Sequence, residues 1–94
     1  MTYLGLLEIA VRIPSADSLK AKRHVLRGLK DRIRSKFNVS LAETDGLDTW
    51  QRADLAFSVV AGQQYRVEET LQRIFRVVDN CPDVGVLEFH SELF

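Results

Sequence analysis

Apolar positions recur along the chain with two different periods, and the changes of period divide the sequence into six elements. Near the N-terminus Leu7, Ile9 and Val11 occupy every second position, which is typical of a strand with one buried face. In two longer segments the apolar positions are three and four residues apart, which is typical of an amphipathic helix. The pattern predicts strands over residues 3–13, 37–43, 53–61 and 84–93, and helices over residues 19–36 and 64–80.

Residues that interrupt regular structure lie between these elements. Pro14 ends the first strand, and Asp17 or Ser18 is suited to cap the N-terminus of the first helix. Gly62 ends the third strand, and Pro82 follows the second helix. The order β-α-β-β-α-β is that of the ferredoxin-like split unit. We therefore expect an α+β fold, in which a four-stranded antiparallel sheet of spatial order 4-1-3-2 carries both helices on one face.

The opposite face of this sheet is predicted to be open. It mixes small and polar side chains with an apolar patch, and it contains no aromatic ring. The predicted patch consists of Leu4, Leu6, Val60 and Val86. On the last strand, Leu87 and Phe89 are predicted to point toward the helices instead. Because exposed apolar patches often meet another protein, we expect a homodimer or a contact with a protein partner through the open face or an edge strand.

Length and composition indicate the class of protein. A chain of 94 residues suits a single domain over 1–94. The lone cysteine, Cys81, excludes an intrachain disulfide and is compatible with a reducing compartment. No apolar run is long enough to span a membrane, and the N-terminus lacks the basic segment and cleavage site of a signal peptide. We therefore expect a cytoplasmic protein without membrane contact.

Charge is distributed unevenly along the chain. Thirteen Lys and Arg residues balance thirteen Asp and Glu residues, so the formal net charge is zero. Residues 18–36, however, hold eight basic residues and one acidic residue, Asp31, which gives 8 − 1 = +7. The rest of the chain holds five basic and twelve acidic residues, which gives 5 − 12 = −7. The predicted first helix is therefore strongly basic within a neutral protein.

Five of these basic residues fall on one side of the predicted helix. They lie within an arc of about 80°, beside the apolar stripe, at 3.6 residues per turn. The five are Lys20, Arg23, Arg27, Lys30 and Arg34. One interpretation is a solvated helix face, because Lys and Arg are good helix formers. The other is a binding surface for a polyanion, above all RNA, because like charges four residues apart repel and cations near a helix N-terminus oppose the helix dipole.

Lys22 differs from these five in its position. Helical geometry places it within the apolar arc, among Leu19, Leu26 and Leu29. Its side chain either extends past the end of the sheet into solvent or reaches a carboxylate or a bound anion. We therefore include Lys22 with the five other residues in the candidate anion- or RNA-binding set.

A second group of candidate residues precedes the third strand. It consists of Trp50, Gln51 and Arg52. A tryptophan in a loop of a small domain usually covers the edge of the core. The alternative is contact with a partner, because Trp and Arg are enriched at binding hot spots. The nearby Glu43, Asp45 and Asp48 lack the spacing of a calcium loop, so we expect solvated turn residues there.

The sequence offers little support for an enzyme. His24 and His90 lie on different predicted elements and have no spaced partner for a metal or a catalytic triad. Glycine-rich phosphate loops and Cys-x-x-Cys pairs are absent. We therefore predict no catalytic residue, metal or cofactor. The enzymatic alternative is a small phosphoryl or acyl-phosphate hydrolase, because Lys20, Lys22 and Arg23 at the strand-to-helix turn could hold a phosphoryl group.

Three segments carry a family resemblance. They are Ser18-Leu19-Lys20-Ala21-Lys22-Arg23, Phe37-Asn38-Val39-Ser40 and Asp48-Thr49-Trp50-Gln51-Arg52-Ala53. With them, essentially the whole chain resembles the YlxP-like bacterial proteins, a family of unknown function. The resemblance implies a ferredoxin-like fold and, in many bacteria, a gene among those for transcription termination and translation initiation factors. It implies no established activity, cofactor or catalytic residue.

These observations together favour a binding module. The leading hypothesis is contact with structured RNA, the ribosome or the translation machinery through the basic first helix. The alternatives are the hydrolase described above and a protein-interaction adaptor that uses Trp50 and the open sheet face.

Overall fold

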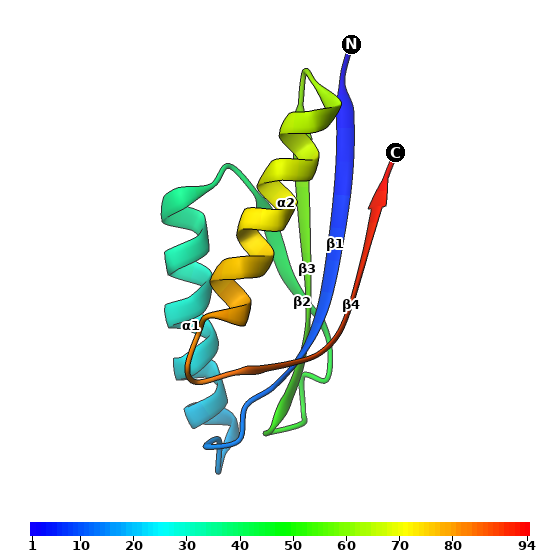
Figure 1. Cartoon of the computed structure of the whole chain (residues 1–94). Helices are drawn as coiled ribbons and strands as arrows, with labels where there is room; N and C mark the ends of the chain where they lie inside the picture. Colours follow the sequence, from blue (N-terminus) through cyan, green and yellow to red (C-terminus); the bar gives the residue numbers. More distant parts are fainter.

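The computed structural model describes residues 1–94, and its elements follow the predicted order (Figure 1). The strands are β1 (Tyr3–Arg12), β2 (Ser40–Asp45), β3 (Arg52–Ala61) and β4 (Gly85–Leu93), and the helices are α1 (Leu19–Lys36) and α2 (Gln64–Asp79). The strands form one antiparallel sheet in the order β2-β3-β1-β4, which is the predicted order 4-1-3-2 counted from the other edge. The predicted ferredoxin-like α+β fold is therefore confirmed.

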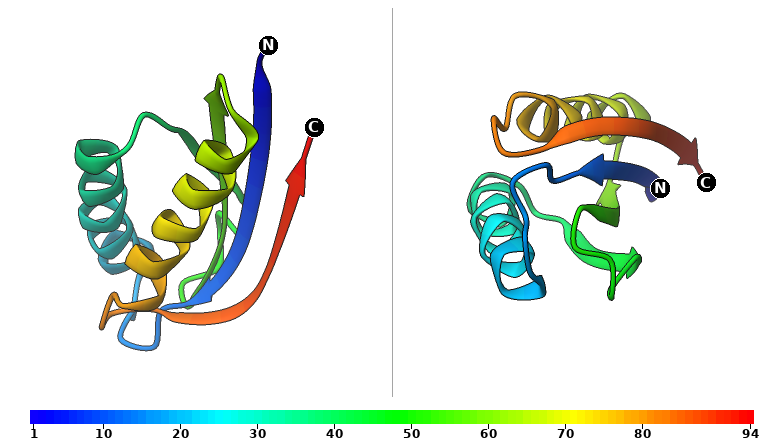
Figure 2. Two further views of the ribbon diagram at one scale, coloured as in Figure 1. Left: turned by 45° about the horizontal axis from the view of Figure 1, so that its top comes forward. Right: turned by 90° about the horizontal axis from the view of Figure 1, so that it is seen from below.

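The two helices cover one face of the sheet and leave the other face without a helix (Figures 1 and 2). α2 lies over the central strands β1 and β3, and α1 lies beside it on the side away from β4. β2 and β4 are the two edges of the sheet. The layout therefore places the basic helix α1 far from the edge formed by β4.

The hydrophobic core lies between the helices and the sheet. The central strands supply alternate residues to it, among them Ile9 and Val11 of β1 and Phe57 of β3, all nearly inaccessible to solvent. Gly5 of β1 lies under α2, where an added Cβ would come within 2.8 Å of Leu71 Cδ1. A glycine at this position therefore lets α2 approach the sheet closely.

The ends of α1 confirm one boundary prediction and correct another. The Ser18 hydroxyl accepts a hydrogen bond from Ala21 N at 3.0 Å, so Ser18 is the N-cap. At the other end, Phe37 N donates to Ile33 O at 3.0 Å, so Phe37 ends the helix. The strand predicted over residues 37–43 begins only at Ser40. Phe37 and Val39 alternate like strand residues because both pack against the core while the chain returns to the sheet.

β4 contains an irregularity that the sequence pattern does not reveal. Ala10 pairs with Glu88 and Val11 pairs with Val86, so Leu87 is an extra residue in a β-bulge. An extra residue reverses the alternation of side chains along a strand. Val86 accordingly packs against the core, and Leu87 is 50% exposed. The predictions that Val86 lies on the open face and that Leu87 points toward the helices are therefore wrong.

Neither helix combines the length and the apolar character that crossing a membrane requires.

Candidate nucleic-acid interface

The five basic residues on one side of α1 form a surface that we call the basic ridge. It consists of Lys20, Arg23, Arg27, Lys30 and Arg34, of which Lys30 is half-buried and the other four are exposed. No member of the basic ridge belongs to any ion pair of the protein. Arg34 alone makes a polar contact, in which its Nη2 donates to Leu41 O of β2 at 3.4 Å. The charges of the basic ridge are therefore not neutralised within the chain.

Four members of the basic ridge converge on one concave surface. Arg23, Arg27, Lys30 and Arg34 line a hollow of about 270 Å³ on α1, which Glu43 of β2 closes on the other side. The exposed Asp31 is the remaining charged residue in the lining. The lining thus holds four cations and two carboxylates, and an anion entering the hollow could approach several cations together.

Lys22 lies on the buried side of α1, and only 2% of its side chain is exposed. Its ammonium group donates to Gly46 O at 2.6 Å and to Thr49 O at 2.7 Å. It also forms an ion pair with Glu43 Oε2 at 2.9 Å. Because the side chain is almost inaccessible and its ammonium group is enclosed by two carbonyls and a carboxylate, Lys22 is not available to an external anion. Of the two predicted possibilities, Lys22 therefore reaches a carboxylate, and it does not belong to the basic ridge.

Glu43 is the partner that the sequence reasoning missed. Its side chain is 13% exposed, although we expected a solvated turn residue. No donor meets the geometry of a hydrogen bond to its buried Oε2 atom. The polar contact of this atom is the ion pair with the Lys22 ammonium group, at 2.9 Å. A lysine on the apolar side of a helix was the available signal, because a buried ammonium requires an anionic or carbonyl partner. The charge of Glu43 in the hollow is thus compensated by Lys22.

The turn between β2 and β3 is shaped for this contact. Gly46 has a φ of +73°, in the left-handed region that favours glycine. Gly46 N donates to Asp45 Oδ1 at 2.8 Å, and Thr49 N donates to Gly46 O at 3.0 Å. The turn therefore directs two carbonyl oxygens toward Lys22 and holds the β2–β3 loop against the N-terminal half of α1.

Trp50 lies in this loop and is 52% exposed. It does not belong to the hydrophobic core or to the residues that pack against the core. The expectation that Trp50 covers the edge of the core is therefore wrong. Because Lys22 holds the carbonyl of the preceding residue, Thr49, the loop that carries the exposed indole is tied to α1.

Gln51 connects the loop before β3 to the loop before α1. Its Nε2 atom lies 3.3 Å from both Pro14 O and Ala16 O, to which it donates. Its backbone oxygen accepts a hydrogen bond from Ile13 N at 2.9 Å. These contacts hold the two loops together, so Gln51 has a structural task within the chain.

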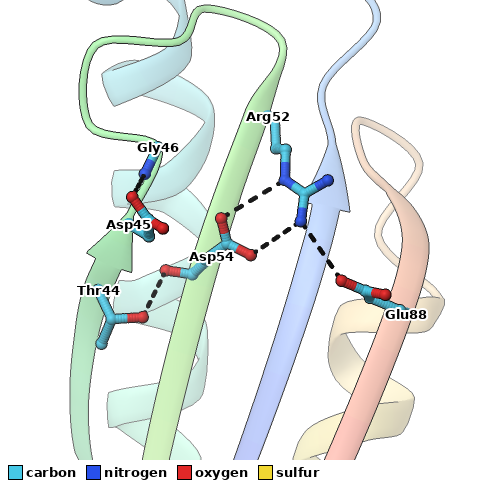
Figure 3. A network of polar contacts seen from close by, with 6 residues as sticks. All are labelled: Thr44, Asp45, Gly46, Arg52, Asp54 and Glu88. Atoms are coloured by element: carbon cyan, nitrogen blue, oxygen red, sulfur yellow. Dashed lines mark hydrogen bonds and ion pairs between the residues drawn. The ribbon is translucent and has the colours of Figure 1, made fainter.

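Arg52 lies on the open face of the sheet and reaches across β1 (Figure 3). Its Nη2 atom lies 3.2 Å from Asp54 Oδ1 on β3 and 3.4 Å from Glu88 Oε1 on β4. Asp54 raises the pKa of Arg52 through its hydrogen bond and through the negative charge of its carboxylate, so the guanidinium stays charged. Of the three candidate partner contacts, Trp50 alone has no polar partner in the chain.

The structure also bears on the chemical alternatives. The hydrolase hypothesis requires Lys20, Lys22 and Arg23 around one phosphoryl group, and the ammonium of Lys22 is turned into the protein instead. The His, Cys, Asp and Glu side chains nowhere gather in a group of three or more that could hold a metal ion. Of the predicted basic residues, those that the structure brings together around one hollow are four members of the basic ridge.

The fold defines the class: this is a ferredoxin-like α+β protein whose first helix carries a basic surface. The family model described as "Protein of unknown function (DUF503)" matches residues 4–91, so the chain belongs to the DUF503 family. The uncharacterized protein YlxP of Bacillus subtilis (strain 168) is 37% identical over 91 residues, which cover 97% of this chain and 99% of that protein. The resemblance to YlxP-like proteins is therefore confirmed.

Two solved structures share the fold at low sequence identity. A de novo designed protein with ferredoxin fold, solved by NMR in solution, has a TM-score of 0.55 at 13% identity and covers 96% of this chain and 83% of its own. A C-terminal segment of the alpha subunit of aIF2 from Pyrococcus abyssi has a TM-score of 0.52 at 18% identity and covers 99% of this chain and 49% of its own. At these identities the likeness concerns the fold alone.

Proposed function

We propose that the protein binds folded RNA, such as that of the ribosome, through the phosphate groups that meet the basic ridge of α1. The observation that carries this proposal is the hollow lined by Arg23, Arg27, Lys30 and Arg34, whose charges have no ion-pair partner in the chain. Like charges in such a row repel one another and do not stabilise the helix. A phosphate backbone beside the row would relieve this repulsion and release counterions.

The rest of the molecule indicates how such binding would be achieved. The central strands β1 and β3 present no aromatic side chain on the open face on which a base could stack, so the mode of RNA-recognition motifs does not apply. Contacts to phosphates are insensitive to base sequence, so the shape of the RNA would supply most of the specificity. The exposed indole of Trp50, in the loop that Lys22 ties to this helix, is suited to contact one unstacked base.

The salt dependence of binding tests the proposal. A labelled RNA hairpin is titrated with the protein by fluorescence anisotropy over a series of salt concentrations. The triple variant R23Q/R27Q/K30Q should bind more weakly, and the slope of log affinity against log salt should be flatter by about two to three units, if each lost side chain meets one phosphate.

α2 supplies a matched control for net charge. The variant R66Q/R73Q/R76Q removes the same three charges from the other helix and should leave the slope close to that of the parent. If the two triple variants reduce the slope equally, the protein attracts RNA only through its overall charge, and the basic ridge is a solvated surface.

Co-purification gives the corresponding test in the cell. The tagged protein is isolated from its own cell extract at low and at moderate salt, and the bound RNA is sequenced. Recovery of ribosomal or other structured RNA with the parent and its loss with R23Q/R27Q/K30Q would support the proposal. Absence of RNA from both preparations would refute it.

A further inference from the structure

β4 is an edge strand whose outer backbone groups have no partner in the chain. Phe94 N donates to Leu4 O at 2.8 Å, which makes this pair hydrogen-bonded. In an antiparallel ladder the hydrogen-bonded pairs alternate along each strand. It follows that Phe89, Ser91 and Leu93 direct their N–H and C=O groups away from β1. These three residues present donors and acceptors at the spacing that another strand requires.

The opposite edge of the sheet is protected, whereas the part of β4 beyond its bulge at Leu87 is not. β2 has only six residues and contains a register shift between Glu43 and Asp45. In addition, Arg34 donates to Leu41 O on this edge. Beyond the bulge, β4 continues in regular pairing from Glu88 to Leu93, and the strand contains no Lys and no Pro, which commonly prevent association at an edge. Association through a strand edge is therefore expected at β4.

The side chains beside this edge are apolar and exposed. Phe89 is 61% exposed although it lies on the helix face of the sheet opposite Ile9. Its ring packs on Phe75 of α2 with a centroid distance of 4.6 Å. Phe75, Phe89 and Leu93 line a groove of about 550 Å³ between β4 and α2. A strand added to β4 would cover these side chains as well as satisfy the backbone.

We infer that β4 pairs with β4 of a second copy of this chain, antiparallel and with the two-fold axis at Ser91. In this register Ser91 faces Ser91 of the second copy, and Phe89 faces its Leu93. On the open face, His90 faces its Glu92, and an imidazole N–H is a suitable donor for that carboxylate. The three outward-facing residues of each copy would each donate and accept one backbone hydrogen bond. This register thus matches the backbone groups, the apolar side chains and the polar side chains of the two copies.

Neighbouring registers match less well. An axis at His90 places Glu88 opposite Glu92 twice, and like charges in opposed positions are unfavourable. An axis at Phe89 brings the bulge at Leu87 into the ladder, where the spacing of the backbone groups is interrupted. The Ser91 register uses only the regular part of β4 beyond the bulge.

Substitutions at His90 test the interface through the dissociation constant of the dimer, measured by analytical ultracentrifugation. His90 is exposed, so its replacement should not affect folding, which circular dichroism checks. H90K should tighten the dimer and H90E should weaken it, each by about two- to thirty-fold, because the pair with Glu92 occurs twice. An axis at His90 would instead make H90K weaken the dimer, because two lysines would meet.

Cysteine cross-linking tests the register itself. In S91C the two introduced cysteines face each other as a hydrogen-bonded pair about 5.5 Å apart, which permits a disulfide. In F89C the two introduced cysteines are separated by four residues along the paired strands, about 13 Å, which is too far for a disulfide. Under mild oxidation S91C should give a covalent dimer, whereas F89C and the parent, whose Cys81 is buried, should not.

Three results would overturn the inference. One is a parent that stays monomeric at millimolar concentration. Another is a dimer that V60E on the open face disrupts and H90E does not, which would place the contact on the open face. The third is cross-linking of F89C without cross-linking of S91C. None of these variants lies on α1, so their outcomes are separate from those of the RNA experiments.

Discussion

The two sides of α1 use the same kind of side chain in opposite ways. On the buried side, Lys22 directs its ammonium group to two backbone carbonyls and the carboxylate of Glu43. On the exposed side, the next residue, Arg23, lies in the basic ridge and has no ion-pair partner. These two adjacent cations of one helix thus differ in whether they have a partner within the protein. Lys22 is accounted for by the fold, and the basic ridge is not.

This difference teaches how to separate structural from functional charge. A buried cation contributes through its partners, and removing it leaves those partners unsatisfied. An exposed cation without a partner contributes little to stability, so its presence must be judged against external ligands. The two sides of α1 should therefore respond oppositely to substitution: stability should change on the buried side, and binding should change on the exposed side.

The largest expected effect is that of K22M. Methionine fills a similar volume but leaves Glu43 and the carbonyls of Gly46 and Thr49 without their buried donor. Breaking a buried pair in this way costs about 3 to 5 kcal/mol in the free energy of unfolding. Urea denaturation measures the loss. The adjacent substitution R23M is the matched control and should have almost no effect. Equal losses in the two variants would contradict the distinction between the two sides.

A smaller effect is expected for E43Q. Glutamine keeps the shape and an oxygen acceptor for Lys22, so the loss in the free energy of unfolding should be about 1 kcal/mol. The substitution also removes a carboxylate from the lining of the hollow beside the basic ridge. RNA affinity should therefore rise while stability falls, as measured by anisotropy and urea denaturation on the same preparation. E69Q on α2 serves as a control for the loss of one negative charge. A fall in RNA affinity for E43Q would contradict the placement of the anion in the hollow.

Most of the fold could be predicted from the sequence because the period of apolar residues and the interrupting residues agree. The prediction failed where the backbone departs from a regular period. The bulge at Leu87 reverses the alternation on β4, and no residue type in the sequence marks it. Phe37 and Val39 alternate like strand residues while they serve the return from α1 to the sheet. These errors concern how side chains are placed and leave the topology unchanged.

The candidate site could be predicted only in part. The basic ridge follows from helical spacing, which needs no knowledge of the tertiary structure. The roles of Lys22 and Glu43 depend on contacts between residues more than twenty positions apart, which spacing does not reveal. Residue type left Trp50 with two possible roles, a cover over the edge of the core or a contact with a partner, and the loop held by Lys22 and Gln51 leaves the indole exposed.

The smallest expected effect on stability is that of the triple variant R23Q/R27Q/K30Q. These side chains form no ion pair, so the melting temperature should change by less than about 3 °C. The direction should be upward at low salt, because the substitutions remove repulsion along the basic ridge. Added salt screens the same repulsion and should raise the melting temperature of the parent more than that of the variant. Differential scanning fluorimetry at low and moderate salt gives both comparisons. A large fall in the melting temperature of the triple variant would mean that the exposed side of α1 supports the fold as the buried side does. In that case the loss of RNA binding in this variant would be a consequence of unfolding, and the functional interpretation of the basic ridge would be refuted.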